Sequence, residues 1–192
     1  MYHGLAHLPV HNKNLQPNVY EGGFDIWEST LDLLNLIDQW ETAPKRVLDL
    51  GCGSGLVGIK AHLKFNCQVD FLDFNQSVID EYTIPTCKLN KCDMEKLRFF
   101  HGDWSEFTRG PYDLILTSET LYDNRLYPSL FKCLQRNLEG ECFLASKKVF
   151  IGLSGNVKEF MQLSGSRIVS EYNKGIKRVI LKYEQEKIMI SL

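Results

Sequence analysis

The sequence predicts an α/β fold built on a mostly parallel, doubly wound sheet with an antiparallel C-terminal hairpin. Five strand-like segments follow one another along the chain, and segments of helical periodicity separate most of them. A glycine-rich turn directly follows the first strand, at the edge where open parallel sheets bind ligands. The chain closes with two strand-like runs joined by Asn173, Lys174 and Gly175, which are typical hairpin residues. The last strands are therefore expected to be antiparallel.

The individual elements follow from hydrophobic spacing and from the residues that interrupt it. An amphipathic helix is expected from Trp27, because apolar residues recur every three or four positions until Pro44. Pro85 is expected to disturb the helical stretch that follows the second strand. The other expected elements are strands at 46–50, 68–73, 97–103, 112–118 and 141–149, helices at 56–65, around 78–79, at 127–138 and at 156–163, and hairpin strands at 166–172 and 175–184.

Length and composition indicate a single globular domain. The chain has 192 residues, of which 44% are apolar and 24% are charged, which are ordinary globular proportions. A chain of this length buries roughly 70% of the surface that its unfolded form exposes, so folding requires no disulfide and no structural metal. We expect one domain over residues 20–192. Residues 1–19 are polar and contain Pro9 and Pro17, and we expect them to form a flexible arm.

Neither the histidines nor the cysteines are expected to form a metal site. His3, His7 and His11 would share one face of a helix, but Pro9 interrupts that helix. The six cysteines include no Cys-x-x-Cys pair, which argues against zinc and favours reduced, buried thiols. We therefore assign no metal.

Charge and hydropathy limit the environment and the partners that we expect. The formal net charge is −2, so nothing indicates a general attraction to nucleic acid or to an anionic membrane. The N-terminus has no basic patch followed by an apolar run, and no segment approaches the roughly 20 apolar residues of a membrane helix. We expect a cytoplasmic protein, a nuclear protein or both.

The turn after the first strand carries the strongest chemical signal. In the segment VLDLGCGSG, Gly51, Gly53 and Gly55 lack a Cβ atom, so a ligand can approach the backbone closely. The dinucleotide-binding pattern GxGxxG would require a glycine at the position of Leu56, which disfavours a nicotinamide cofactor. The spacing GxGxG indicates a different cofactor.

Two acidic residues next to this turn indicate S-adenosylmethionine. Asp49 precedes the first glycine by two residues and is expected to help hold the cationic amino group of the cofactor, directly or through water. Asp73 ends the second strand and is expected to accept hydrogen bonds from the ribose hydroxyls. The alternative is that each acid caps the helix that follows it.

A third segment at the same edge of the sheet is expected to hold the adenine. Gly102, Asp103 and Trp104 follow the third strand and offer a polar contact beside a flat apolar face. The alternative is that Trp104 belongs to the hydrophobic core.

The order of these motifs resembles the seven-stranded methyltransferases that use S-adenosylmethionine, and among them the protein-histidine N-methyltransferases. The matching segments are YEGGFDIWEST (20–30), VLDLGCGSGLVGI (47–59), FLDFNQSVIDEYTIP (71–85), FFHGDWSEF (99–107), YDLILTSETLY (112–122), FLASK (143–147) and KGIKRVI (174–180). The glycine motif by itself indicates only a methyltransferase, whereas the segments around Trp27, Asn75 and Glu119 are more specific. The resemblance implies a Rossmann-like, seven-stranded sheet with helices on both faces.

The resemblance also implies roles for individual residues. Glu119 and Tyr122 form an ExxY motif after the fourth strand that would face the substrate side chain; alternatively, Glu119 caps the next helix and Tyr122 only packs. The remaining implied roles concern the cofactor: Trp27 and Glu28 would border it and the substrate entrance, Gly51, Gly53 and Gly55 would wrap its methionyl part, Asp73 would hold the ribose, Asn75 would lie near the adenosine, Trp104 near the adenine, and Asp103 and Ser118 would complete the cofactor site.

The chain departs from the family pattern in two places. The glycine-rich run expected after the fifth strand reads IGLSGN here, with Ser154 and Asn156 where glycines are expected, in a region expected to shape the substrate site. Longer family members also carry a large N-terminal extension that this chain nearly lacks.

The function implied by the resemblance is methylation of a histidine in a large-subunit ribosomal protein by a monomeric enzyme. A lysine methyltransferase on the same scaffold and a non-catalytic, cofactor-binding partner of ribosomal proteins are the alternatives. A nucleic-acid amino methyltransferase is disfavoured, because the fourth strand leads into TSET and not into an [DN]PP[YF] motif.

Overall fold

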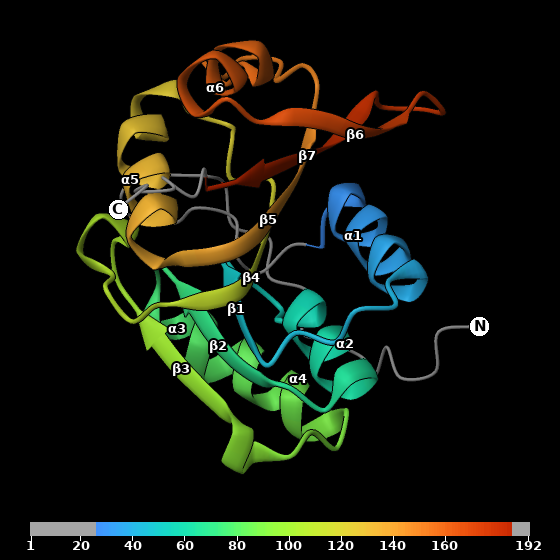
Figure 1. Cartoon of the computed structure of the whole chain (residues 1–192), viewed down its shortest axis with the longest axis vertical. Coiled ribbons are helices and arrows are strands. Elements are labelled where there is room, and N and C mark those ends of the chain that lie inside the picture. The colour runs from blue at the N-terminus through green and yellow to red at the C-terminus, as the bar shows by residue number, and fades with distance from the viewer. Residues whose placement is uncertain (1–25, 186–192) are drawn as a thin grey trace, which may run out of the picture.

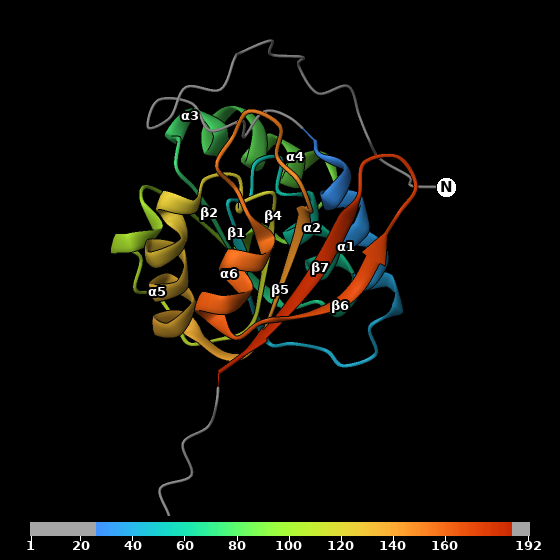
Figure 2. The same ribbon diagram turned by 90° about the horizontal axis from the view of Figure 1, so that it is seen from above.

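The computed structural model describes residues 26–185. Within them the strands form one seven-stranded sheet in the order β3-β2-β1-β4-β5-β7-β6, and helices cover both of its faces (Figures 1 and 2). The strands are β1 (Arg46–Leu50), β2 (Gln68–Asp73), β3 (Leu97–His101), β4 (Tyr112–Ser118), β5 (Leu138–Lys147), β6 (Arg167–Tyr172) and β7 (Arg178–Glu184). The helices are α1 (Glu28–Gln39), α2 (Leu56–Phe65), α3 (Gln76–Val78), α4 (Ile84–Leu89), α5 (Tyr127–Asn137) and α6 (Val157–Ser164), with short helical turns η1 (Ile79–Thr83), η2 (Met94–Lys96), η3 (Trp104–Glu106) and η4 (Asn124–Leu126).

Strand directions confirm the predicted α/β sheet. The neighbours from β3 through β5 are parallel, and β7 runs antiparallel to both β5 and β6. The chain moves outward from β1 to β3 and then crosses back to place β4 on the other side of β1. This reversal of strand order between β1 and β4 is where open α/β sheets bind ligands, at the carboxyl ends of the strands.

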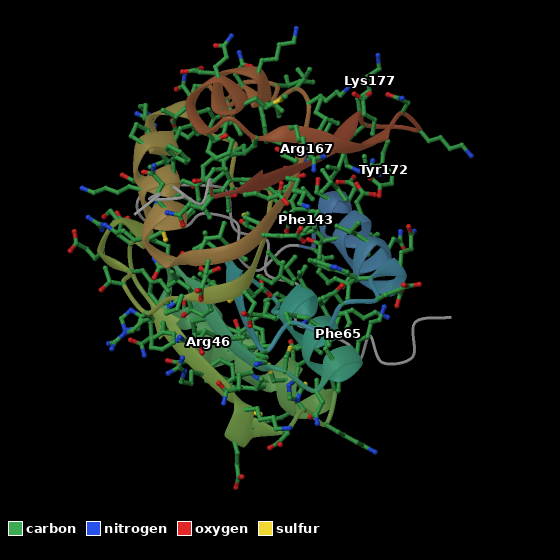
Figure 3. All side chains as sticks on the ribbon, in the orientation of Figure 1. Arg46, Phe65, Phe143, Arg167, Tyr172 and Lys177 are labelled. Carbon is green, nitrogen blue, oxygen red and sulfur yellow. The ribbon has the colours of Figure 1, made fainter. Side chains whose placement is uncertain are left out.

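Successive side chains along a strand point to opposite faces of the sheet, and a hydrophobic core lies on each face. On β4, Leu114 and Leu116 belong to the core beneath α1, α2 and α4, whereas Ile115 belongs to the core beneath α5 and α6. On β5, the ring of Phe143, labelled in Figure 3, packs edge-to-face with Trp40 at the end of α1, with the ring centroids 4.9 Å apart. The C-terminal end of helix α1 therefore packs against the sheet.

The helix after β2 is longer than the sequence predicts. Pro85 was expected to disturb it, but the chain stays helical from Gln76 to Leu89 by including the π-helical turn η1 just before the proline. Pro85 then lies in the first turn of α4. The proline is tolerated inside this helical stretch because the π-helical turn just before it interrupts the regular hydrogen-bond pattern, where a residue without an N–H costs least.

The remaining predictions concern the N-terminal arm, the cysteines and membrane-spanning segments. The arm over residues 1–19, with its three histidines, and the first part of the segment YEGGFDIWEST lie outside the described residues. All six cysteines lie within the described part of the chain and are buried and free, as predicted. From residue 26 to residue 185, no helix combines the length and the apolar character needed to cross a membrane.

Candidate active site

A cavity opens at the carboxyl ends of β1, β2 and β4, beside the first turn of α1. It lies at the switch point of the sheet, as predicted for the ligand site. The residues that line it are Trp27, Thr30, Gly51, Cys52, Gly53, Ser54, Leu72, Asp73, Phe74, Gly102, Asp103, Trp104, Ser118, Glu119, Thr120, Tyr122 and Leu126.

The glycine turn forms the floor of this cavity. The backbone N–H groups of Gly51 and Cys52 both donate to the carbonyl of Leu72, at 2.8 and 2.9 Å, which ties the end of β1 to the end of β2. Gly51 has a φ of +67°, and a Cβ atom there would lie 3.0 Å from the Thr120 side chain. Both the backbone conformation and the space therefore favour glycine at this position.

Thr83 holds the glycine turn through a hydrogen bond and is a residue that the sequence reasoning missed. Its hydroxyl donates to the carbonyl of Gly53 at 2.7 Å, and its side chain is fully buried. Thr83 ends the π-helical turn η1, so this turn places the hydroxyl under the glycine loop. A methyl group at Gly55 would lie 2.9 Å from the Thr83 side chain, so Gly55 serves packing and does not line the cavity.

The carboxylate of Asp73 faces the glycine turn. One oxygen accepts the backbone N–H of Gly53 at 2.9 Å, and the other accepts the backbone N–H of Asn75 at 3.2 Å. An ionised carboxylate offers about four acceptor positions, so further donors such as two ribose hydroxyls fit on the cavity side. The arrangement of Asp73 therefore suits the ribose of S-adenosylmethionine.

Asp49 points away from the cavity. Because side chains alternate along β1, Asp49 faces the same way as Val47, toward α2, where it accepts the backbone N–H of Gly58 at 2.8 Å. Gly58 lies in the first turn of α2, so Asp49 has the helix-capping position that the sequence left open as the alternative. Burial is the main reason that the pKa of Asp49 rises to about 8.

Trp104 takes part in both the cavity and the core. It begins the short turn η3, which Asp103 caps by accepting the backbone N–H of Ser105 at 2.8 Å. The Trp104 ring lines the cavity and also packs on the core beneath α5. Trp104 therefore belongs to the core, as one interpretation has it, and also lines the cavity; its contact with adenine stays a prediction.

Glu119 lies at the junction between the end of β4 and the first turn of α1. Its φ of 58° is left-handed, and its N–H extends the ladder of β4 by donating to the carbonyl of Ala145 at 2.9 Å. The Ser29 hydroxyl donates to its carboxylate, and beside it the Thr30 and Ser118 hydroxyls are hydrogen bonded at 3.0 Å. These two contacts fix α1 to the cavity.

Partial burial and polar neighbours set the charge state of Glu119. Burial raises the pKa of its carboxyl group above the ordinary value, while the Ser29 hydroxyl and the nearby Lys147 act in the opposite direction. The alternative in which Glu119 caps the next helix is wrong, because Asp123 caps η4 by accepting the backbone N–H of Arg125. A half-buried carboxylate with a raised pKa beside a ligand cavity is typical of a functional group.

The structure thus brings together most of the predicted site residues. Glu28, Asn75, Asp49 and Gly55 lie outside the lining of the cavity, and Glu28 is exposed at the start of α1. Those that line it are Trp27, Gly51, Gly53, Asp73, Asp103, Trp104, Ser118, Glu119 and Tyr122. Sequence reasoning missed Ser29, Thr30, Thr83 and Thr120, although all four lie inside motif segments that the sequence singled out.

Across residues 26–185, no three histidine, cysteine, aspartate or glutamate side chains are grouped closely enough to hold a metal ion.

This sheet order, with a glycine turn after β1 and an acid at the end of β2, defines the class of S-adenosylmethionine-dependent methyltransferases. A family model described as "Lysine methyltransferase" matches residues 14–165, and the chain belongs to that family. The predicted fold, the methyltransferase class and the cofactor are thereby confirmed.

Curated relatives carry a histidine-specific name. The chain is 36% identical over 158 residues to the "Histidine protein methyltransferase 1 homolog" of Dictyostelium discoideum, an alignment that covers 78% of this chain and 51% of the relative. It is also 36% identical over 213 residues to the homolog of the same name from Bos taurus, covering 89% of this chain and 57% of the relative. The chain therefore spans somewhat more than half the length of these curated relatives.

Solved structures share the fold. The ribosomal protein L11 methylase of Lactobacillus delbrueckii subsp. bulgaricus has a TM-score of 0.65 and 18% sequence identity, over 82% of this chain and 79% of that one.

Proposed function

We propose that the protein transfers a methyl group from S-adenosylmethionine to a histidine side chain of a protein substrate. The observation that carries the proposal is the position of Glu119, a half-buried carboxylate held by α1 at the edge of the cofactor cavity. The name of the curated relatives supports histidine as the acceptor.

The chemistry asks the protein mainly to position its substrates. Bound S-adenosylmethionine supplies an electrophilic methyl group on a positively charged sulfur. A neutral imidazole attacks through one nitrogen without prior removal of a proton and gains a positive charge, which is lost when the proton on its other nitrogen leaves for solvent. In this proposal the Glu119 carboxylate accepts a hydrogen bond from that second nitrogen, which orients the ring and stabilises the growing charge.

Two aromatic side chains complete the proposed acceptor site. Trp27 and Tyr122 border the cavity on the side of Glu119. The Lys147 ammonium lies 4.2 Å from the centre of the Trp27 ring and so occupies one face of this ring. We assign Tyr122 as the aromatic contact for the substrate ring.

A second candidate is methylation of lysine, which the description of the family model favours. A lysine ammonium must lose a proton before it can attack, so an acceptor for that proton is required. Glu119 is the carboxylate at the cavity edge that is placed for this role. The same residue thus serves either acceptor, and the modified amino acid distinguishes the two candidates.

The proposal extends to the partner and the setting. The resemblance implies a large-subunit ribosomal protein as substrate, and we include this substrate in the proposal. A monomeric state and a cytoplasmic or nuclear location, both expected from the sequence, belong to the same proposal.

The experiment uses the purified protein, labelled S-adenosylmethionine, and ribosomes or ribosomal proteins from the same source. After hydrolysis, label in methylhistidine is the expected result, and label in methyllysine would move the chemistry to the second candidate. Asp73→Ala should abolish the label, whereas Asp80→Ala, an exposed acid on η1, should not. If no amino acid is labelled although S-adenosylhomocysteine raises the melting temperature, the proposed activity on these proteins is wrong.

A further inference from the structure

An apolar groove lies next to the cofactor cavity, and the side chains of its outer part have no role in the proposed reaction. Val149, Phe150, Ile151 and Leu153 line it from the loop between β5 and α6, and Ile176 lines it from the connection between β6 and β7. In Figure 2 the loop after β5 lies beside the N-terminal end of α1. Lys177, the neighbour of Ile176, marks the β6–β7 connection in Figure 3.

The groove exposes apolar side chains that a folded protein usually covers. The exposed fraction is 95% for Ile151, 68% for Val149, 47% for Ile176 and 45% for Leu153. A single exposed apolar residue is ordinary, but several that converge on one groove indicate a binding surface.

The position of the groove identifies its occupant. Trp27, Glu119 and Tyr122 line both the groove and the cofactor cavity, so the two are continuous. A polypeptide in the groove therefore lies against the residues at the edge of the cavity, where the acceptor side chain must enter. A second copy of this chain in the same place would close that entrance.

The charges around the groove define the chemistry of this polypeptide. Among the residues that line it, Glu119 and Lys147 are charged, and both lie at its inner end beside Trp27. The outer part is formed by aliphatic side chains and Phe150. It can therefore bury an apolar side chain of a partner but can form no ion pair with it.

From this geometry we infer that the groove binds an apolar side chain that flanks the methyl-accepting residue of the substrate polypeptide. The inference rests on the proposed function and adds to it a preference for sequence around the acceptor. Apolar contacts of this size discriminate between substrates by about 10-fold or more.

Two pools of short peptides test the preference. Every peptide has a central histidine; in one pool the neighbouring positions are leucine, isoleucine or phenylalanine, and in the other they are serine, asparagine or glutamine. Binding of each fluorescent pool is measured by anisotropy in the presence of S-adenosylhomocysteine, and methylhistidine is measured separately with labelled S-adenosylmethionine. The wild-type protein should bind the apolar pool about 10-fold more tightly.

Substitutions in the groove should remove this preference. The double variant Val149→Ser/Ile151→Ser should bind the apolar pool about 10-fold more weakly and leave the affinity for S-adenosylhomocysteine unchanged. Both residues are exposed, so the fold should be unaffected. Leu63→Ser is the matched control, because Leu63 is 52% exposed on α2 and does not line the groove.

The outcomes separate this inference from the proposed function. Equal or undetectable binding of both pools by the wild-type protein, or equal losses in the groove variant and in Leu63→Ser, would overturn the inference. Selective binding of the apolar pool without methylhistidine in either pool would support the groove as a binding surface and contradict histidine methylation.

Discussion

Ser29, in the first turn of α1, donates its hydroxyl to the carboxylate of Glu119, which directly follows β4. The contact joins two segments that lie far apart in the chain and holds the carboxylate at the edge of the cofactor cavity. Among the contacts that lower the pKa of the half-buried Glu119, the Ser29 hydrogen bond has the largest effect, ahead of the nearby Lys147. Ser29 is therefore a positioning residue for Glu119.

Removal of this hydroxyl should change the pH dependence of methyl transfer. The proposed role of Glu119 requires its ionised form, so activity falls as the pH drops through the pKa of Glu119. Burial raises this pKa and the Ser29 hydrogen bond lowers it, so Ser29→Ala should move the acid limb of the kcat profile to higher pH. The measurement is kcat as a function of pH with saturating cofactor.

Thr30→Ala is the matched control for that profile. It removes a hydroxyl from the same turn, but this hydroxyl bonds to Ser118 and not to Glu119, so the acid limb should stay in place. Glu119→Gln should lower kcat by about 100-fold, the usual scale for one electrostatic contact in a transition state, and leave cofactor affinity nearly unchanged. Loss of cofactor binding in Glu119→Gln would contradict the role assigned to this residue.

Asp73→Asn should weaken binding of S-adenosylhomocysteine, as measured by calorimetry. Hydrogen bonds to a charged group contribute about 1.5–3 kcal/mol, which corresponds to a loss of roughly 10- to 150-fold in affinity. Asp80→Asn, on the exposed side of η1, should bind the ligand like the wild-type protein. An unchanged affinity in Asp73→Asn would place the ribose elsewhere.

Thr83→Val should destabilise the protein and weaken the cofactor site together. The substitution keeps the shape of the side chain but leaves the carbonyl of Gly53 without the hydroxyl that donates to it. A buried polar group left in this way costs about 1–3 kcal/mol, to be measured by chemical denaturation. Thr83→Ser retains the donor and should retain most of the affinity for S-adenosylhomocysteine; an equal loss of affinity in both variants would show that the methyl group, and not the hydroxyl, supports the turn.

Asp49 should make the wild-type protein less stable as the pH rises. Burial raises the pKa of this carboxyl from 3.8 to about 8 in the folded protein, so the folded state holds a proton that the unfolded state releases. The stabilisation that this retained proton provides is fully present below pH 4. The free energy of unfolding then falls as the pH rises toward 8, by up to about 1.4 kcal/mol per pH unit. Denaturation curves of Asp49→Asn, which still accepts the Gly58 N–H, should lack this slope; parallel pH profiles in the two proteins would contradict a protonated Asp49.

Much of the fold and of the cofactor site was predictable because it depends on local sequence. The alternation of short apolar runs with helical spacing determines the strands and helices of a parallel sheet. The glycines after β1 and the acid at the end of β2 come together because neighbouring parallel strands end at the same edge. The helix around Pro85 was the main error, because a π-helical turn that absorbs a proline has no simple sequence signal.

The sequence by itself determined the class of fold, the cofactor edge of the sheet and most of the residues that line the cavity. Tertiary structure decided which side chains meet there: Ser29 with Glu119, Thr83 with the glycine turn, and Asp49 with α2 in place of the cavity. It also brought the loop after β5 and the β6–β7 connection together into one groove. These contacts depend on how helices rotate and dock on the sheet, which is set by packing over the whole molecule and not by the spacing of residues along the chain.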